Sequence, residues 1–325
     1  MGSPKKETFT WSNTSDKLRF ERLDFLIAAI STALSLIFYL LTMSRSIPYI
    51  DGGELTTVLW TLGIAHPTGY PLFTLLGGAF VRIPIFSEVD ESKDYSVEMY
   101  TRDILTSLPQ NSVVISYQWD TFVSASLYYQ NVDKLRTDII VIDKELLRRS
   151  WYAAQVHSRY TSLFPKDDPV YGAYQDNLRL FENGLPYNSN SIEQSYSNFI
   201  REIIFDALRN DRKVLVGPEI EDQYLYGLTK VPYGLLFEVK IDTNYVQYNP
   251  VGLNGFQAAE KIQSDYSRQI INFYSRMFLA RAAYEYSHKH LNRTLSWLDR
   301  ALRVDPALQG AQTAKLQILQ ELKSK

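Results

Sequence analysis

The sequence predicts a mixed fold, with an N-terminal transmembrane helix of one or two spans, a soluble α/β domain and a C-terminal α-helical hairpin region. Three observations predict it. An uncharged apolar run lies near the N-terminus. Short β-rich runs then alternate with helical patterns, and leucines recur at three- and four-residue steps near the C-terminus.

The apolar run, Phe25 to Ser44, holds twenty residues without a charge. This length is sufficient for a helix to cross a bilayer, and the run is apolar nearly all round. A buried helix of a large soluble protein is the alternative. A cleaved signal peptide fits less well, because no small-residue cleavage site follows.

Basic residues before this run predict its orientation. Only Arg45 closely follows the run, whereas five basic residues precede it: Lys5, Lys6, Lys17, Arg19 and Arg22. The positive-inside rule then places the N-terminus in the cytoplasm. We therefore expect an integral membrane protein of the bacterial inner membrane or the endoplasmic reticulum.

A second apolar stretch, Pro71 to Phe86, is about sixteen residues long and contains Arg82. It is short for a crossing and fits a re-entrant helix equally well. The predicted organisation lists five parts: residues 1–22 as a cytoplasmic tail, 23–86 as a membrane segment, 87–94 as a linker, 95–250 as an α/β domain and 251–325 as a helical region.

In the α/β domain, β-rich runs predict four strands, at residues 112–117, 139–142, 214–216 and 235–241. Residues 121–130 fit a helix, for which Asp120 is a plausible N-cap. Strand runs separated by helical patterns indicate a partly parallel sheet.

The C-terminal region predicts helices over residues 256–287, 291–304 and 307–322, with a break at Asp305-Pro306. Its pattern LSWLDRALRVDP resembles the end of a tetratricopeptide (TPR) repeat. One or two such units are too few for a solenoid, so we expect them to dock onto the α/β domain or onto a partner.

Composition excludes several classes of function. The net charge of −2 argues against nucleic acid as a partner, and the absence of cysteine excludes disulfides and thiol catalysis. The four histidines are scattered along the chain, so we expect no metal site and no cofactor.

The segment from Ile50 to Gly77, IDGGELTTVLWTLGIAHPTGYPLFTLLG, carries the candidate chemistry. It places the carboxylates of Asp51 and Glu54 after the apolar run, and His66 follows among turn residues. Charged groups at a bilayer surface are costly without a role. The two acids could also merely favour a helix N-terminus, and His66 could be only a turn residue.

The pattern DGGEL…LGIAHPTGYPLFTLLG resembles the N-terminal signature of transmembrane protein O-mannosyltransferases, the type that modifies plexin IPT domains, and of their bacterial relatives in the GT-C superfamily. Gly52 replaces a common serine and Thr68 a common proline. Residues 108–152 resemble the soluble C-terminal region of the same family.

This resemblance implies transfer of a mannose-like sugar from a polyprenyl-phosphate donor to protein hydroxyls. It implies that Asp51 is the catalytic base, with Glu54, His66, Gly69 and Tyr70 as substrate-binding residues. The implied partners are membrane lipid, the lipid-linked sugar and a protein acceptor.

Most membrane helices of that family have no counterpart here. We therefore expect the chain to be incomplete alone, with other membrane helices supplied in trans. The alternative is a membrane-anchored, non-catalytic interaction protein that uses its TPR-like region.

Overall fold

The structure is a computed structural model, and it describes residues 22–42, 51–65, 69–81, 95–161, 163–164, 168–249, 253 and 265–324. The chain divides into two compact units, Met1–Met43 and Ser44–Lys325. The second unit holds α2, α3, the sheet and the C-terminal helices together. The finer domain boundaries stay predictions, and the expected linker at 87–94 lies outside the described residues.

The first unit contains one described helix, α1 (Arg22–Thr42). Within the described residues, no helix combines the length and the apolar character that a bilayer crossing requires. The charged side chains of Arg22 and Asp24 lie in the first turn of α1, and the helix ends at Thr42, before the predicted end at Ser44. The predicted transmembrane helix, the fold class built on it and the integral-membrane localisation are therefore wrong.

The second unit begins with two short helices, α2 (Gly52–Thr61) and α3 (Pro71–Phe80). A helix of ten residues is about 15 Å long, roughly half of a bilayer core, so α3 by itself is too short for the second span considered for residues 71–86. The rest of that stretch, residues 82–86, lies outside the described residues. Pro71 occupies the first turn of α3, where its missing N–H leaves no helical bond unmade.

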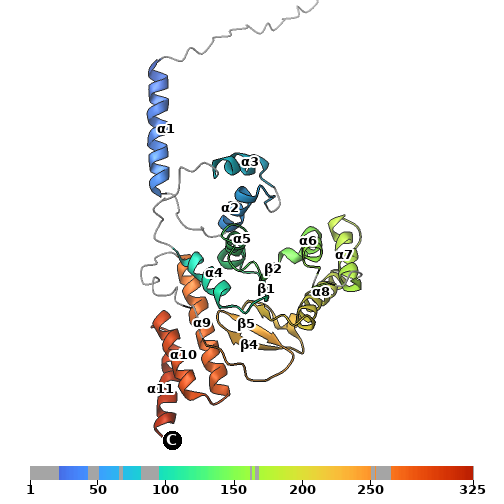
Figure 1. Ribbon diagram of the computed structural model, residues 1–325, viewed down its shortest axis with the longest axis vertical. Helices are drawn as coiled ribbons and strands as arrows, with labels where there is room; N and C mark the ends of the chain where they lie inside the picture. The colour runs from blue at the N-terminus through green and yellow to red at the C-terminus, as the bar shows by residue number, and fades with distance from the viewer. Residues whose placement is uncertain are drawn as a thin grey trace, which may run out of the picture. The chain divides into compact units, whose positions relative to one another are not determined.

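A five-stranded sheet forms the centre of this unit (Figure 1). Its strands are β1 (Val113–Ser116), β2 (Ile140–Asp143), β3 (Val214–Val216), β4 (Thr229–Tyr233) and β5 (Leu236–Lys240). Their order is β2-β1-β3-β5-β4. β1 pairs in parallel with β2 and β3, whereas β5 pairs antiparallel with β3 and β4.

The four predicted strands are confirmed, and so is the partly parallel sheet. β4 was not predicted. It lies at the edge of the sheet and contains Pro232, a residue that lacks a backbone donor and is tolerated at such edges. Its sequence, TKVPY, has a weaker strand pattern than the continuous apolar runs of β1 to β3.

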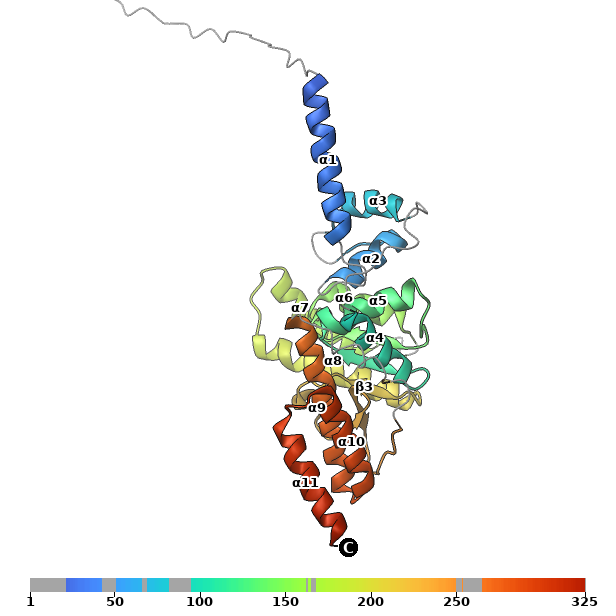
Figure 2. The ribbon, with the colours of Figure 1, turned by 90° about the vertical axis from the view of Figure 1, so that its left-hand side faces the viewer.

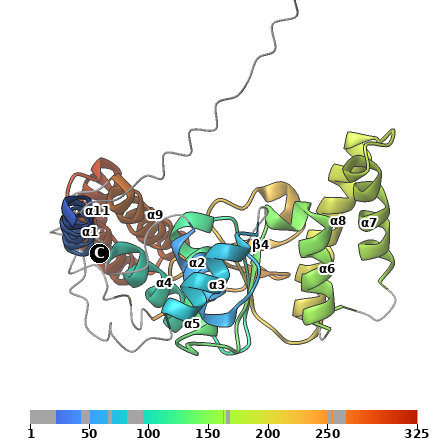
Figure 3. The same ribbon diagram turned by 90° about the horizontal axis from the view of Figure 1, so that it is seen from above.

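Helices cover both faces of the sheet, as Figure 3 shows. Val114 and Leu215 join one buried cluster with residues of α4 and α9, while their neighbours Val113 and Val214 join a second cluster with α8. This alternation follows from the two-residue period of a strand. The flanking helices are α4 (Ser96–Ser107), α5 (Ser124–Asn131), α6 (Ser150–Arg159), α7 (Pro169–Glu182) and α8 (Ser189–Arg209). Short helical turns span Trp119–Val123 (η1, a π-helix), Leu146–Arg148 (η2) and Asp222–Leu225 (η3).

The C-terminal helices are α9 (Asp265–Ser287), α10 (Leu291–Val304) and α11 (Gln309–Lys323), which run beside one another (Figure 2). They dock onto the α/β part, which is the first of the two arrangements expected from the sequence. The hydroxyl of Tyr274 donates to Asp103 of α4 at 2.7 Å, and buried Arg281 donates to the Pro232 carbonyl at 2.7 Å. The TPR-like assignment stays a prediction.

Candidate functional site

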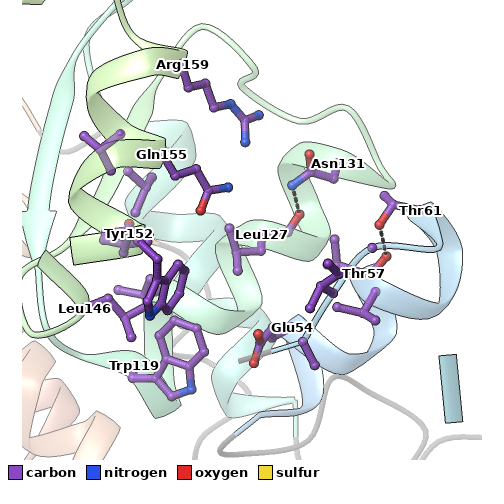
Figure 4. A pocket seen from close by; sticks show the side chains of 18 of the residues that line it. Glu54, Thr57, Thr61, Trp119, Leu127, Asn131, Leu146, Tyr152, Gln155 and Arg159 are labelled. Atoms are coloured by element: carbon purple, nitrogen blue, oxygen red, sulfur yellow. Dashed lines mark hydrogen bonds between the residues drawn. The ribbon is translucent and has the colours of Figure 1, made fainter. Parts of the chain in front are cut away.

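A cavity of about 770 Å³ lies where α2, the η1–α5 segment and α6 meet (Figure 4). Such a volume is typical of sites for small organic ligands. Its described lining consists of Glu54, Thr57, Val58, Thr61, Gly63, Ile64, Ala65, Trp119, Val123, Leu127, Asn131, Val141, Leu146, Trp151, Tyr152, Gln155, Val156, Arg159 and Tyr160.

Close backbone contact fixes α2 at this cavity. A Cβ on Gly53 would lie 2.3 Å from the carbonyl oxygen of Ser124, so only glycine permits this approach. The backbone N–H of Glu54 donates to Oγ of Ser124 at 2.9 Å. The start of α2, with Asp51 at its N-cap and Glu54 in its first turn, is therefore attached to the N-terminus of α5.

The carboxylate of Asp51 is engaged by Trp119. The indole Nε1–H donates to Oδ1 of Asp51 at 2.8 Å. Asp51 is the N-cap residue of α2, yet its side chain makes no capping hydrogen bond to the described backbone of that helix. This carboxylate is thus turned toward the α/β part of the molecule.

Trp119 and Asp120 belong to η1, which follows β1. The N–H groups of Phe122 and Val123 both donate to the Gln118 carbonyl at 3.0 Å, which widens the turn. Gln118 is the N-cap of η1, and Val123 is the N-cap of α5. Asp120 lies inside η1, so the predicted capping role of Asp120 is wrong. Burial, and then the negative charge of Asp51, raise the pKa of Asp120.

The two charged side chains of the described cavity lining, Glu54 and Arg159, lie at opposite ends of the cavity. Figure 4 shows Glu54 near Trp119, with Gln155 and Arg159 on α6 across the cavity. Glu54 is buried, and Arg159 is the one basic side chain in the described lining. Aromatic rings with carboxylate and amide groups can hold a hydroxyl-rich ring by stacking and hydrogen bonding.

Of the predicted site residues, Asp51 is the N-cap of α2 and Glu54 lies in its first turn. Gly69 and Tyr70 form a left-handed turn before α3, outside the described cavity lining. His66 lies outside the described residues. The roles of all five stay predictions.

Most residues of the cavity were not predicted from the sequence, among them Trp119, Trp151 and Arg159. The first two occur in the Trp-Asp-Thr-Phe and Ser-Trp-Tyr segments of the stretch that resembles the family's C-terminal region. Those two segments were the sequence signal from which the two tryptophans could have been predicted as site residues. Among the described residues, no three histidine or acidic side chains are grouped so that they could hold a metal ion.

Comparisons with known proteins point to one class. The family described as the protein O-mannosyl-transferase TMEM260 N-terminal domain matches residues 51–101. This match begins at Asp51 and ends within α4. It supports a relationship to protein O-mannosyl-transferases over this stretch.

Two curated relatives agree with that class. Protein O-mannosyl-transferase TMEM260 of Mus musculus is 49% identical over 51 residues, which are 16% of this chain and 7% of the mouse protein. Protein O-mannosyl-transferase tmem260 of Dictyostelium discoideum is 49% identical over 47 residues, 14% of this chain and 6% of that protein. The chain thus matches less than a tenth of the length of these relatives. No solved structure matches it.

Proposed function

We propose that this chain takes part in protein O-mannosyl transfer, with Asp51 as the general base. The main support is the match that begins at Asp51, together with the position of that carboxylate beside Trp119, a residue of the cavity wall. The names of the relatives supply the reaction class. The role of this chain in it is our inference.

In the proposed reaction, a serine or threonine hydroxyl of an acceptor protein attacks C1 of the sugar. The bond between C1 and the phosphate oxygen of a polyprenyl-phosphate donor breaks, and the bond between C1 and the acceptor oxygen forms. The lipid phosphate leaves with the bonding electrons, and the carboxylate of Asp51 takes the hydroxyl proton. A base in this role contributes roughly a hundred- to ten-thousand-fold in rate.

The cavity is the proposed site of the sugar ring. Glu54 would accept hydrogen bonds from sugar hydroxyls, and the rings of Trp119 and Trp151 offer apolar faces. His66, Gly69 and Tyr70 keep their proposed role in binding the donor. The lipid chain would be held by helices of a partner polypeptide, so the purified chain alone is expected to be inactive.

The test is a transfer assay in extracts of cells that express the full chain, because extracts retain partner polypeptides. Labelled mannose on polyprenyl phosphate is the donor, and a folded acceptor domain is the substrate. Extract of cells without the chain gives the background. We expect labelled acceptor well above that background, and transfer at background level would contradict the proposal and favour the non-catalytic alternative.

A further inference from the structure

Trp119 has two separate roles in the geometry of the site. Its ring lines the cavity, whereas its Nε1–H donates to Oδ1 of Asp51 at 2.8 Å. An indole N–H is a donor only, so its acceptor is oriented by the position of the ring. Hydrogen bonds to an ionised carboxylate are also shorter and stronger than those between neutral groups.

The backbone around Trp119 is well fixed. Gln118, just before it, accepts both bonds that close the π-helical turn, and Ser124, just after that turn, accepts the N–H of Glu54. Turns of this kind are rare and occur frequently at functional sites. One short segment therefore holds the carboxylate of Asp51 and the backbone of the helix that begins beside it.

We propose that Trp119 is a positioning residue, whose indole N–H holds the carboxylate of Asp51 in its reactive orientation. This inference rests on the proposed function, because the orientation matters for transfer only if Asp51 is the base. The ring of Trp119 can meet a ligand through the cavity, but the assigned role belongs to the N–H alone.

Two acids of the described residues lie near Asp51. Asp120 of η1 interacts with Asp51 electrostatically, and Glu54 lies one turn along α2. The sequences of α3 and α5, which pack against α2, contain no charged residue. Both named neighbours are acids, so their repulsion tends to turn the Asp51 carboxylate away, and the Trp119 N–H opposes that movement.

The first test needs no sugar donor. Nuclear magnetic resonance of the full chain with ¹⁵N-labelled tryptophan gives one indole N–H signal for each of the five tryptophans. The signal missing in Trp119→Phe is assigned to Trp119. We expect that signal to move in Asp51→Asn, because a neutral amide oxygen accepts a weaker hydrogen bond than a carboxylate does. A Trp119 signal that is unchanged in Asp51→Asn overturns the proposal.

The second test is transfer by Trp119→Phe, which keeps an aromatic ring and removes the donor. We expect a rate lower by about tenfold, the order for a hydrogen bond to a charged group, with KM changed less than about twofold. Tyr226→Phe, an exposed aromatic control, should match the wild type. A wild-type rate in Trp119→Phe would overturn the proposal.

These two tests separate the two ideas. If the wild-type chain transfers no sugar, the proposed function fails, yet the resonance experiment still decides whether Trp119 holds Asp51. If Trp119→Phe does not fold, Trp119→Tyr serves for the assignment and the rate measurement.

Discussion

Gly53 of α2 and Ser124 of α5 approach so closely that a Cβ on Gly53 would lie 2.3 Å from the Ser124 carbonyl oxygen. No Cβ tolerates such a distance to a backbone atom, so α2 could accept a side chain here only by moving away from α5. Because Asp51 precedes Gly53 by two residues, this contact also fixes the position of the proposed base.

The first prediction concerns this contact. Gly53→Ala should lower the free energy of unfolding by about 1 to 3 kcal/mol, as overpacking does, despite the better helix propensity of alanine. Gly172→Ala is the matched control, because it also lies inside a helix and its Cβ would meet no described atom within 4 Å. It should raise stability by roughly 0.5 to 1 kcal/mol. Urea unfolding measures the change in the free energy of unfolding for both variants. If Gly53→Ala raised stability as Gly172→Ala is expected to do, the close contact would be refuted.

The second prediction concerns the cavity. Leu127→Trp would fill the space between α5 and α6, since Leu127 points into it (Figure 4). We expect transfer to fall at least about tenfold while the unfolding midpoint changes little, because a filled site excludes its ligand. Leu180→Trp, on the exposed side of α7, is the control. Normal transfer by Leu127→Trp would show that the ligand binds elsewhere.

The third prediction concerns pH. Burial raises the pKa of Asp143, at the end of β2, to about 6. The folded protein therefore holds this proton more tightly than the unfolded chain. The resulting stability is present below about pH 4 and is lost as the pH rises through 6.

Asp143→Asn should remove this pH dependence. Its Oδ1 can still accept the N–H of Leu146, a 2.7 Å bond in the wild type. Between pH 4 and 7, the free energy of unfolding should fall by about 2 to 3 kcal/mol less in the variant than in the wild type. Identical pH dependence would mean that this carboxyl titrates alike in both states. Asp176→Asn, an exposed control on α7, should match the wild type.

The fourth prediction concerns the docking of the C-terminal helices. Arg281 is 1% exposed, pairs with Glu285 at 2.7 Å and donates to the carbonyls of Pro232 and Val246. Arg281→Met should cost about 3 to 5 kcal/mol, because it leaves a buried carboxylate and two carbonyls without this donor. Arg179→Met, at an exposed pair on α7, should cost less than about 1 kcal/mol. A small effect at Arg281 would contradict the proposed docking.

The strands were predictable because β1, β2 and β3 are continuous apolar runs, a pattern that indicates burial on both faces. The edge strand β4 was not, because edge position depends on which strands are neighbours. The membrane prediction failed for a different reason. It counted the apolar residues between Phe25 and Ser44. The helix α1 instead has Arg22 and Asp24 in its first turn and ends at Thr42.

The acids of the candidate site were visible in the sequence, but their surroundings were not. Trp119 meets Asp51 from 68 residues away, and α6 adds Gln155 and Arg159 to the same cavity. Such encounters arise from tertiary packing, which no local periodicity encodes. The close approach of Gly53 to Ser124 likewise becomes evident only when α2 and α5 are packed together.

The most direct test of the central claim is sugar transfer by Asp51→Asn in extracts that contain the full chain. The amide has the shape of the carboxylate but cannot take the hydroxyl proton, so transfer should fall by roughly a hundred- to ten-thousand-fold. Asp176→Asn, with its exposed side chain on α7, should transfer at the wild-type rate. Transfer by Asp51→Asn close to that of the wild type would contradict the assignment of Asp51 as the base.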